Sequence, residues 1–196
     1  MKKFKVLLLL LFVSIFMTGC LGDEPEDSSL LKGKHDVVIT VKDYGIIELE
    51  LDADVAPITV TNFIDLVKDK FYDGLTFHRI MDGFMIQGGD PEGNGTGGSK
   101  NTIKGEFSSN GVENNISHKR GVISMARSQD NNSASSQFFI VQEDSTFLDG
   151  QYAAFGKVTK GMDVVDKIAE ILVVLLWFPN KICVSSSSAY LFLFCL

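Results

Sequence analysis

The sequence is poor in the residues that define several protein classes. Its 196 residues include only 3 Cys, 4 Pro and 1 Trp, while 45% are hydrophobic. Three cysteines cannot build a disulfide framework, and no Cys or His spacing indicates a zinc site. Proline and glycine are too few for a collagen-like or low-complexity chain. What remains is the composition of an ordinary folded domain, long enough to bury a core.

Positive charge is also scarce. The chain has 18 Lys and Arg against 25 Asp and Glu, which gives a net charge of −7, and no basic cluster stands out. Nucleic-acid binding depends on neutralising phosphates with basic side chains, so we expect no nucleic-acid partner. Residues 93–100, GNGTGGSK, nearly match a phosphate-binding loop. The Ser and Lys stand in the wrong order and no helical pattern follows, which argues against nucleotide binding.

The first 20 residues have the order of an export signal. Three lysines precede an apolar run at 6–16 that is too short to be counted as a spanning helix. The sequence 17–20, MTGC, resembles the lipobox of prokaryotic lipoproteins. That resemblance implies a signal peptide at 1–19 and a diacylated Cys20, which would anchor the protein to the outer face of the cytoplasmic membrane or elsewhere in the cell envelope. Residues 20–33 are acidic and polar and predict a flexible tether. An uncleaved N-terminal anchor is the alternative.

The C-terminal residues 171–196 form an atypical tail. Two apolar pieces, 171–178 and 189–196, are each too short to span a membrane. Pro179 and a run of four serines separate them, and neither helical nor strand periodicity is clean. A shifted reading frame and a truncated chain are both compatible with this pattern.

The middle of the chain, residues 34–170, reads as one domain with many short strands. Residues 37–51 alternate apolar and polar side chains about Tyr44-Gly45, which predicts a β-hairpin. Apolar residues at helical spacing follow Pro57, and a second, shorter helix is expected from Met162 to about Ala169. Between these helices the short apolar runs stand at residues 75–80, 84–90, 121–126, 136–141 and 152–158. This series predicts an all-β barrel or sandwich.

Three segments of this domain carry candidate functional residues. In FHRIMDGFMIQGGD, residues 77–90, Arg79 stands in an apolar strand and needs a partner, because burying a charge is costly. In SQFFIV, Gln137 and Phe139 are two residues apart and share one face of a strand. FLDG, residues 147–150, ends at a turn. Taken singly, each segment is more typical of a protein core than of a site.

Taken together, the segments resemble the cyclophilin-type peptidyl-prolyl cis-trans isomerases. The motifs are F-H-R-I-x-x-G-F-M-x-Q-G-G-D, G-x-x-S-M-A, S-Q-F-F-I and F-L-D-G followed by F-G-K-V, in that order within 35–169. The resemblance implies a mainly β fold, a closed eight-stranded antiparallel β-barrel capped by two α-helices. It implies a monomeric isomerase of X-Pro bonds that binds proline-containing polypeptides and needs no cofactor or metal. With the export signal, it predicts a folding catalyst for exported proteins.

The resemblance also assigns site residues. The catalytic role falls on Arg79, and Phe84, Met85, Phe139 and Leu148 would form the pocket for the proline ring. The full set implied to bind substrate is Phe84, Met85, Gln87, Gly95, Thr96, Ala126, Arg127, Gln137, Phe139, Phe147, Leu148 and Tyr152.

Three of these positions depart from the animal members of the family. Phe147 stands where those proteins often have Trp, Tyr152 where they often have His, and Arg127 where Asn is frequent. The lost indole N–H predicts weak cyclosporin binding with isomerase activity retained. The family also closes its barrel with a final strand, and nothing after residue 171 matches that strand well. Residues 182–184 or 191–194 are the candidates, and without either the barrel has an open edge.

Two other functions compete with the isomerase. A non-catalytic holdase or scaffold that binds proline-containing segments would use the same pocket residues. A hydrolase would need His78 or His118 beside a Ser and an Asp, and the G-x-S-x-G turn that such enzymes use is absent from the sequence.

Overall fold

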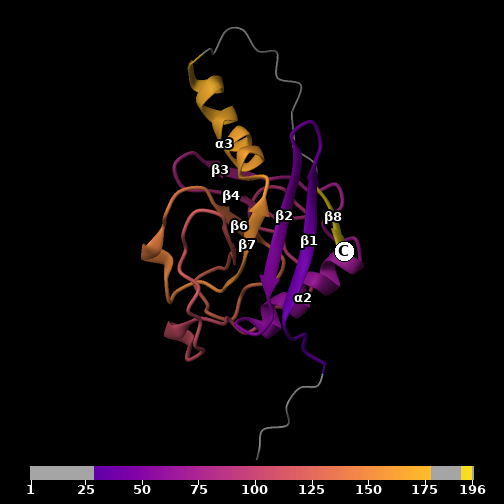
Figure 1. Ribbon diagram of the computed structural model, residues 1–196, viewed down its shortest axis with the longest axis vertical. Coiled ribbons are helices and arrows are strands. Elements are labelled where there is room, and N and C mark those ends of the chain that lie inside the picture. The colour runs from indigo at the N-terminus through magenta and orange to yellow at the C-terminus, as the bar shows by residue number, and fades with distance from the viewer. Residues whose placement is uncertain (1–28, 178–190, 196) are drawn as a thin grey trace, which may run out of the picture.

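The computed structural model describes residues 29–177 and 191–195. Within them the chain forms one antiparallel sheet and two α-helices, and the helices lie at opposite ends of the sheet (Figure 1). The strands are β1 (Lys34–Val41), β2 (Gly45–Asp52), β3 (Arg79–Met81), β4 (Met85–Gly88), β5 (Val122–Met125), β6 (Phe138–Val141), β7 (Ala154–Lys160) and β8 (Leu191–Cys195). The helices are α2 (Pro57–Lys68) and α3 (Met162–Trp177), with the short 3-10 helices η1 (Ser108–Asn110) and η2 (Thr146–Leu148). The predicted mainly β class with two helices is confirmed.

The first two strands form the predicted hairpin, but its turn lies earlier in the chain than expected. Val41 pairs with Gly45, so the turn consists of residues 42–44 rather than Tyr44-Gly45. Asp43 adopts the left-handed conformation with a φ of 67°, which Asp tolerates better than most residues. The alternation of apolar and polar residues predicts the hairpin, and the left-handed conformation of Asp43 places the turn at residues 42–44.

The sheet curves around one core. Its strand order is β3-β4-β6-β5-β7-β2-β1-β8, and side chains from β1, β2, β4, β5, β6 and β7 all join the same buried cluster. Alternate residues of β1 and β2 supply its first wall, as the period of two predicts. From α2, Val60, Phe63, Ile64 and Val67 are buried against it. A flat sheet cannot bring side chains from so many strands into one cluster, so these strands wrap around the core.

The tail contributes to this sheet. Leu191–Cys195 pairs antiparallel with Val37–Val41, so β8 covers the outer edge of β1. This strand includes one of the two segments considered for the missing last strand. Helix α3 continues to Trp177, eight residues beyond the end expected at Ala169. No ladder joins β3 to β8 within the described residues, so closure of the barrel by hydrogen bonds stays a prediction.

A distant carboxylate holds the start of α2. Ala56 at its N-cap makes no side-chain hydrogen bond to the helix. Instead, Glu106 accepts hydrogen bonds from the backbone N–H groups of Ile58 at 3.0 Å and Thr59 at 2.7 Å. The Thr59 hydroxyl donates to the same carboxylate at 2.6 Å. These donors would otherwise be unsatisfied at a helix N-terminus, so Glu106 ties its loop to the helix.

None of the described helices combines the length and the apolar character that crossing a bilayer requires. The signal peptide predicted at 1–19 and Cys20 lie outside the described residues, as does most of the segment 20–33.

Candidate active site

An apolar cavity of about 340 Å³ opens on one side of the sheet. The residues that line it are Arg79, Phe84, Met85, Gln87, Ala126, Arg127, Phe139, Phe147, Leu148 and Tyr152. Every one of them belongs to the set predicted from the sequence. They come from β3, β4, β6, η2, the β3–β4 turn and two further loops, so the fold assembles the cavity from segments far apart in the chain.

The cavity has a buried floor and an exposed rim. Met85, Phe139 and Leu148 are almost fully buried, and together they form part of a small second core. Phe147, by contrast, is 66% exposed, and its ring centroid lies 5.6 Å from that of Phe84. Tyr152 meets Phe139 edge-on at 5.9 Å. A compact apolar ring entering this cavity would therefore lose its contact with water while the chain on either side stays outside.

Arg79 lies at the mouth of the cavity, on the edge strand β3. It is exposed, so the assumption that its charge is buried is wrong, while the partner expected for it is present. Its partners are neutral: Nη1 donates to Oε1 of Gln87 at 3.2 Å, and Nη2 donates to Sδ of Met81 at 3.1 Å. Within the described residues Arg79 forms no ion pair, so its positive charge is not neutralised by a carboxylate.

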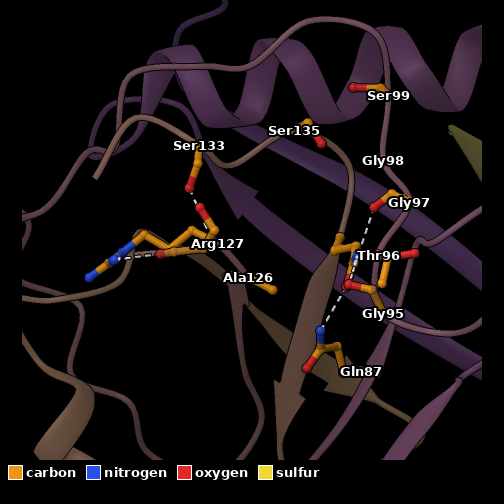
Figure 2. Close-up of a pocket in the computed structure, with 12 residues that line it drawn as sticks. Gln87, Gly95, Thr96, Gly97, Gly98, Ser99, Ala126, Arg127, Ser133 and Ser135 are labelled. Carbon is orange, nitrogen blue, oxygen red and sulfur yellow. Dashed lines mark hydrogen bonds between the residues drawn. The ribbon is translucent and has the colours of Figure 1, made fainter. Parts of the chain in front are cut away.

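A polar cavity of about 360 Å³ adjoins the first and shares Gln87, Ala126 and Arg127 with it. The predicted residues Gly95, Thr96 and Gln137 line this second cavity. Figure 2 shows the chain from Gly95 to Gly98 on one side and Arg127 on the other, with the Arg127 side chain directed away from that loop. Sequence reasoning missed the rest of the wall, namely Gly97, Gly98, Ser99, Ser128, Ser133 and Ser135. Serines and glycines in loops carry no periodic signal that would have indicated them.

Side-chain amides connect the two cavities. Gln87 Nε2 donates to Oε1 of Gln137 at 2.8 Å. Gln137 Nε2 in turn donates to the carbonyl oxygens of Gly95 at 3.1 Å and Gly97 at 2.7 Å. Together with the Arg79–Gln87 bond, this gives a continuous path of hydrogen bonds from the guanidinium to the loop at 95–97.

The loop at 91–97 folds around the carboxylate of Asp90, which is 1% exposed. Asp90 accepts hydrogen bonds from the backbone N–H groups of Glu92, Asn94 and Gly95. Burial opposes its ionisation, but these hydrogen bonds outweigh burial and hold the pKa of Asp90 below its ordinary value. Gly89 precedes it with a φ of 84°, and a side chain there would overlap the carbonyl oxygen of Ser136. The G-G-D sequence is thus needed to form this loop.

Beneath the apolar cavity, His118 lies between Asp149 and Ser124. Its Nδ1 is 2.8 Å from Oδ1 of Asp149, and its Nε2 is 3.0 Å from Oγ of Ser124. This is the order of a hydrolase triad, which the sequence only suggested as a remote alternative. Ser124 is fully buried, however, and the His118 ring stacks against Phe139 at 6.1 Å. A substrate cannot reach that hydroxyl in this conformation, so the arrangement supports the cavity floor.

The protonation of His118 fits that supporting role. Burial lowers the pKa of His118 below its ordinary value, and the opposing effect of Asp149 is smaller. The neutral ring can then donate through one nitrogen to Asp149 and accept through the other from the Ser124 hydroxyl.

Comparison with known proteins identifies the family of this chain. Residues 36–181 match the family model described as cyclophilin type peptidyl-prolyl cis-trans isomerase/CLD. Peptidyl-prolyl cis-trans isomerase A of Dickeya dadantii is 45% identical over 143 residues, which cover 68% of this chain and 71% of the relative. The peptidyl-prolyl cis-trans isomerase of Helicobacter pylori is 43% identical over 149 residues, 75% of this chain and 87% of the relative.

Solved structures show the same fold. The crystal structure of a cyclophilin type peptidyl-prolyl cis-trans isomerase from Cryptosporidium parvum matches with a TM-score of 0.67 and 26% identity, covering 84% of this chain and 98% of that one. A second structure of that protein was solved in the presence of the dipeptide Ala-Pro and matches with a TM-score of 0.66. The chain belongs to the cyclophilin-type peptidyl-prolyl cis-trans isomerase family.

Proposed function

We propose that Arg79 is the catalytic residue of this isomerase and that the protein acts on exported polypeptides from a lipid anchor at Cys20. The isomerase activity itself follows from family membership, and its substrates are proline-containing peptides. The observation that carries the catalytic assignment is a guanidinium without an ion-pair partner, in the described residues, at the mouth of a buried apolar cavity.

The reaction needs no bond to a side chain. Amide resonance gives the C–N bond partial double-bond character and a rotation barrier of ~18–20 kcal/mol. Uncatalysed X-Pro exchange takes roughly tens to hundreds of seconds. As the bond twists, resonance is lost and the lone pair becomes localised on the prolyl nitrogen. A hydrogen-bond donor at that nitrogen therefore stabilises the transition state more than the planar ground state, which is the requirement for catalysis.

Arg79 is suited to be that donor. A guanidinium stays protonated near neutral pH and carries five N–H groups, more than Gln87 and Met81 use. Gln87 limits the positions that the guanidinium adopts, which reduces the reorganisation needed in the transition state. Each ~1.4 kcal/mol of preferential stabilisation gives about tenfold in rate.

The two cavities divide the binding of the peptide. The floor formed by Met85, Phe139 and Leu148 would hold the proline ring, because burial of its apolar surface is favourable. The predicted residues Ala126 and Gln137 would bind the peptide backbone beside it. The cavity bordered by Gly95 and Thr96 would receive the residues before the proline.

A protease-coupled assay on an Ala-Pro peptide tests this function. The full chain should accelerate cis-trans exchange, whereas a holdase or scaffold would bind the peptide without any acceleration. An inactive wild-type chain with a normal melting curve would favour the binding function instead.

The export role rests on the signal-like segment at 1–19 and the lipobox-like 17–20. Two acyl chains would supply stable membrane binding after the signal is removed. The test is labelling of the full chain with radioactive palmitate in a bacterial host, followed by membrane fractionation. Wild type should be labelled and membrane-bound, and Cys20→Ser should not be labelled. Equal labelling of the two chains would contradict the anchor.

A further inference from the structure

The side chain of Arg127 has an unusual environment for a cation on a loop. Nε and Nη2 both donate to the carbonyl oxygen of Gln151, at 3.1 and 3.0 Å. Nη1 donates to the carbonyl oxygens of Ser128 at 2.8 Å and Gln129 at 3.2 Å. Within the described residues no carboxylate pairs with it. All of its hydrogen-bond acceptors are backbone carbonyl oxygens, which stabilise its charge.

Two aromatic rings complete this environment. The guanidinium carbon lies 4.8 Å from the ring centroid of Tyr152 and 5.2 Å from that of Phe107. Both distances are within the range of a cation–π interaction, which favours Arg over Lys because the guanidinium is planar. Phe107 is 1% exposed and cannot move without disturbing the core. Arg127 thus connects the Tyr152 ring to the immobile ring of Phe107.

These contacts connect two walls of the substrate groove, by which we mean the two adjoining cavities. Arg127 and its neighbour Ala126 line both cavities on one side, whereas Tyr152 lines the apolar cavity from a separate segment. Tyr152 also meets Phe139, the floor residue, edge-on. No strand ladder holds residues 149–152, and the Gln151 carbonyl that anchors Arg127 lies within that segment. Arg127 is thus one of the contacts that hold this segment, together with the backbone hydrogen bond from the Ser109 N–H to the Gly150 carbonyl oxygen.

We propose that the Arg127 side chain is a positioning residue that acts through Tyr152: it fixes the width of the apolar cavity and so determines the affinity for proline-containing peptides. This role is distinct from the direct contact with substrate that the family resemblance implies for Arg127. The inference depends on peptide binding in the groove and not on the export role. Because Arg79 supplies the proposed chemistry, Arg127 should affect peptide binding much more than turnover of bound peptide.

The first test compares Arg127→Lys with wild type in the full chain. Lysine keeps the charge but has three donors on one atom and no planar fork, so it cannot make the bonds to Ser128, Gln129 and Gln151 together. We expect the dissociation constant of an Ala-Pro tetrapeptide and KM to rise roughly tenfold, with kcat within about twofold. Arg120→Lys is the matched control, because Arg120 pairs with Asp166 outside both cavities and should leave KM unchanged.

The second test is a double-mutant cycle with Tyr152→Leu. If Arg127 acts through Tyr152, Tyr152→Leu weakens binding to a similar degree, and the double variant is no weaker than either single one. The proposal is overturned if Arg127→Lys binds peptide as wild type does, if Arg120→Lys weakens binding equally, or if the two effects multiply in the double variant. If an Arg127 variant does not fold, Tyr152→Leu alone still tests whether the position of Tyr152 determines peptide affinity. Titration measures binding without turnover, so an inactive wild type would refute the proposed catalysis by Arg79 and leave this test valid.

Discussion

Arg79 and Gln87 lie directly opposite each other on β3 and β4, and the guanidinium of Arg79 donates to the Gln87 side-chain oxygen at 3.2 Å. The same amide donates to Gln137 at 2.8 Å. One glutamine therefore orients the proposed catalytic cation and connects it to the second cavity. Because the partner is neutral, the full positive charge of Arg79 remains available to a twisting prolyl amide.

This relationship predicts that a charge at residue 87 reduces catalysis. In Gln87→Glu the carboxylate would pair with the guanidinium and lose the ability to donate to Gln137. We expect kcat/KM to fall by roughly tenfold or more, measured in the protease-coupled assay. Asn115→Asp introduces the same charge at an exposed position that lines neither cavity and should be close to wild type. A fully active Gln87→Glu variant would mean that the neutral partner is unimportant.

The exposed rim predicts a change in inhibitor binding. Phe147 is 66% exposed at the edge of the apolar cavity and has no polar atom in its side chain. By the family resemblance, Phe147→Trp restores an indole N–H donor, and a hydrogen bond contributes ~0.5–1.5 kcal/mol. Cyclosporin should inhibit wild type weakly and Phe147→Trp several-fold more strongly, with similar peptide turnover in both. Nanomolar inhibition of the wild type would contradict this expectation.

The residues of the apolar cavity were predictable because the motifs that contain them resemble those of the cyclophilin-type isomerases. F-H-R-I and F-M-x-Q form one hairpin, so Arg79, Phe84, Met85 and Gln87 are brought together by β3 and β4. The exposure of Arg79 was not predictable, because an edge strand and a central strand can share the same apolar sequence.

The environments of Arg127 and His118 could not be derived from sequence either. Arg127 interacts with Phe107, Tyr152 and the Gln151 carbonyl, and His118 with Ser124 and Asp149, all brought close by tertiary folding. Such contacts leave no periodic pattern in the chain. The pairing of β8 with β1 was open for the same reason, since the tail lacks clean strand alternation.

The remote capping of α2 predicts a stability effect. Glu106 is 2% exposed and accepts three hydrogen bonds from Ile58 and Thr59. Glu106→Gln places an amide N–H against these donors and should lower the free energy of unfolding by about 1–3 kcal/mol. Urea denaturation measures the change. Glu113→Gln, at an exposed acid, is the control and should change stability by less than about 0.5 kcal/mol.

Buried His118 and partly buried His78 predict a loss of stability on acidification. Burial lowers the pKa of His118 and of His78 in the native state, so near pH 6 the unfolded chain binds more protons than the folded one. Stability is then complete above the ordinary histidine pKa of about 6.5 and falls as the pH drops from there towards the native pKa. The slope is at most about 1.4 kcal/mol per pH unit for each histidine.

Urea denaturation at several pH values from about 7.5 to 5 checks this direction. At the highest pH of this range, His118→Gln should have a lower free energy of unfolding than wild type. On acidification to the lowest pH, its free energy of unfolding should fall by less than that of wild type. A wild-type protein that gains stability on acidification over this range would show that the sign is wrong.

The central claim is that the Arg79 guanidinium stabilises the twisted prolyl amide, and kcat/KM of Arg79→Ala on an Ala-Pro peptide tests it most directly. Arg79 is exposed, so the variant should keep the wild-type melting temperature. Removal of a transition-state hydrogen-bond donor costs about 10²–10³ in rate, and a loss of this size is expected, most of it in kcat. Arg79→Lys should recover only a small part, because an ammonium cannot hold the Gln87 bond and reach the prolyl nitrogen in the same geometry. A folded Arg79→Ala variant with activity within about twofold of wild type would contradict the claim.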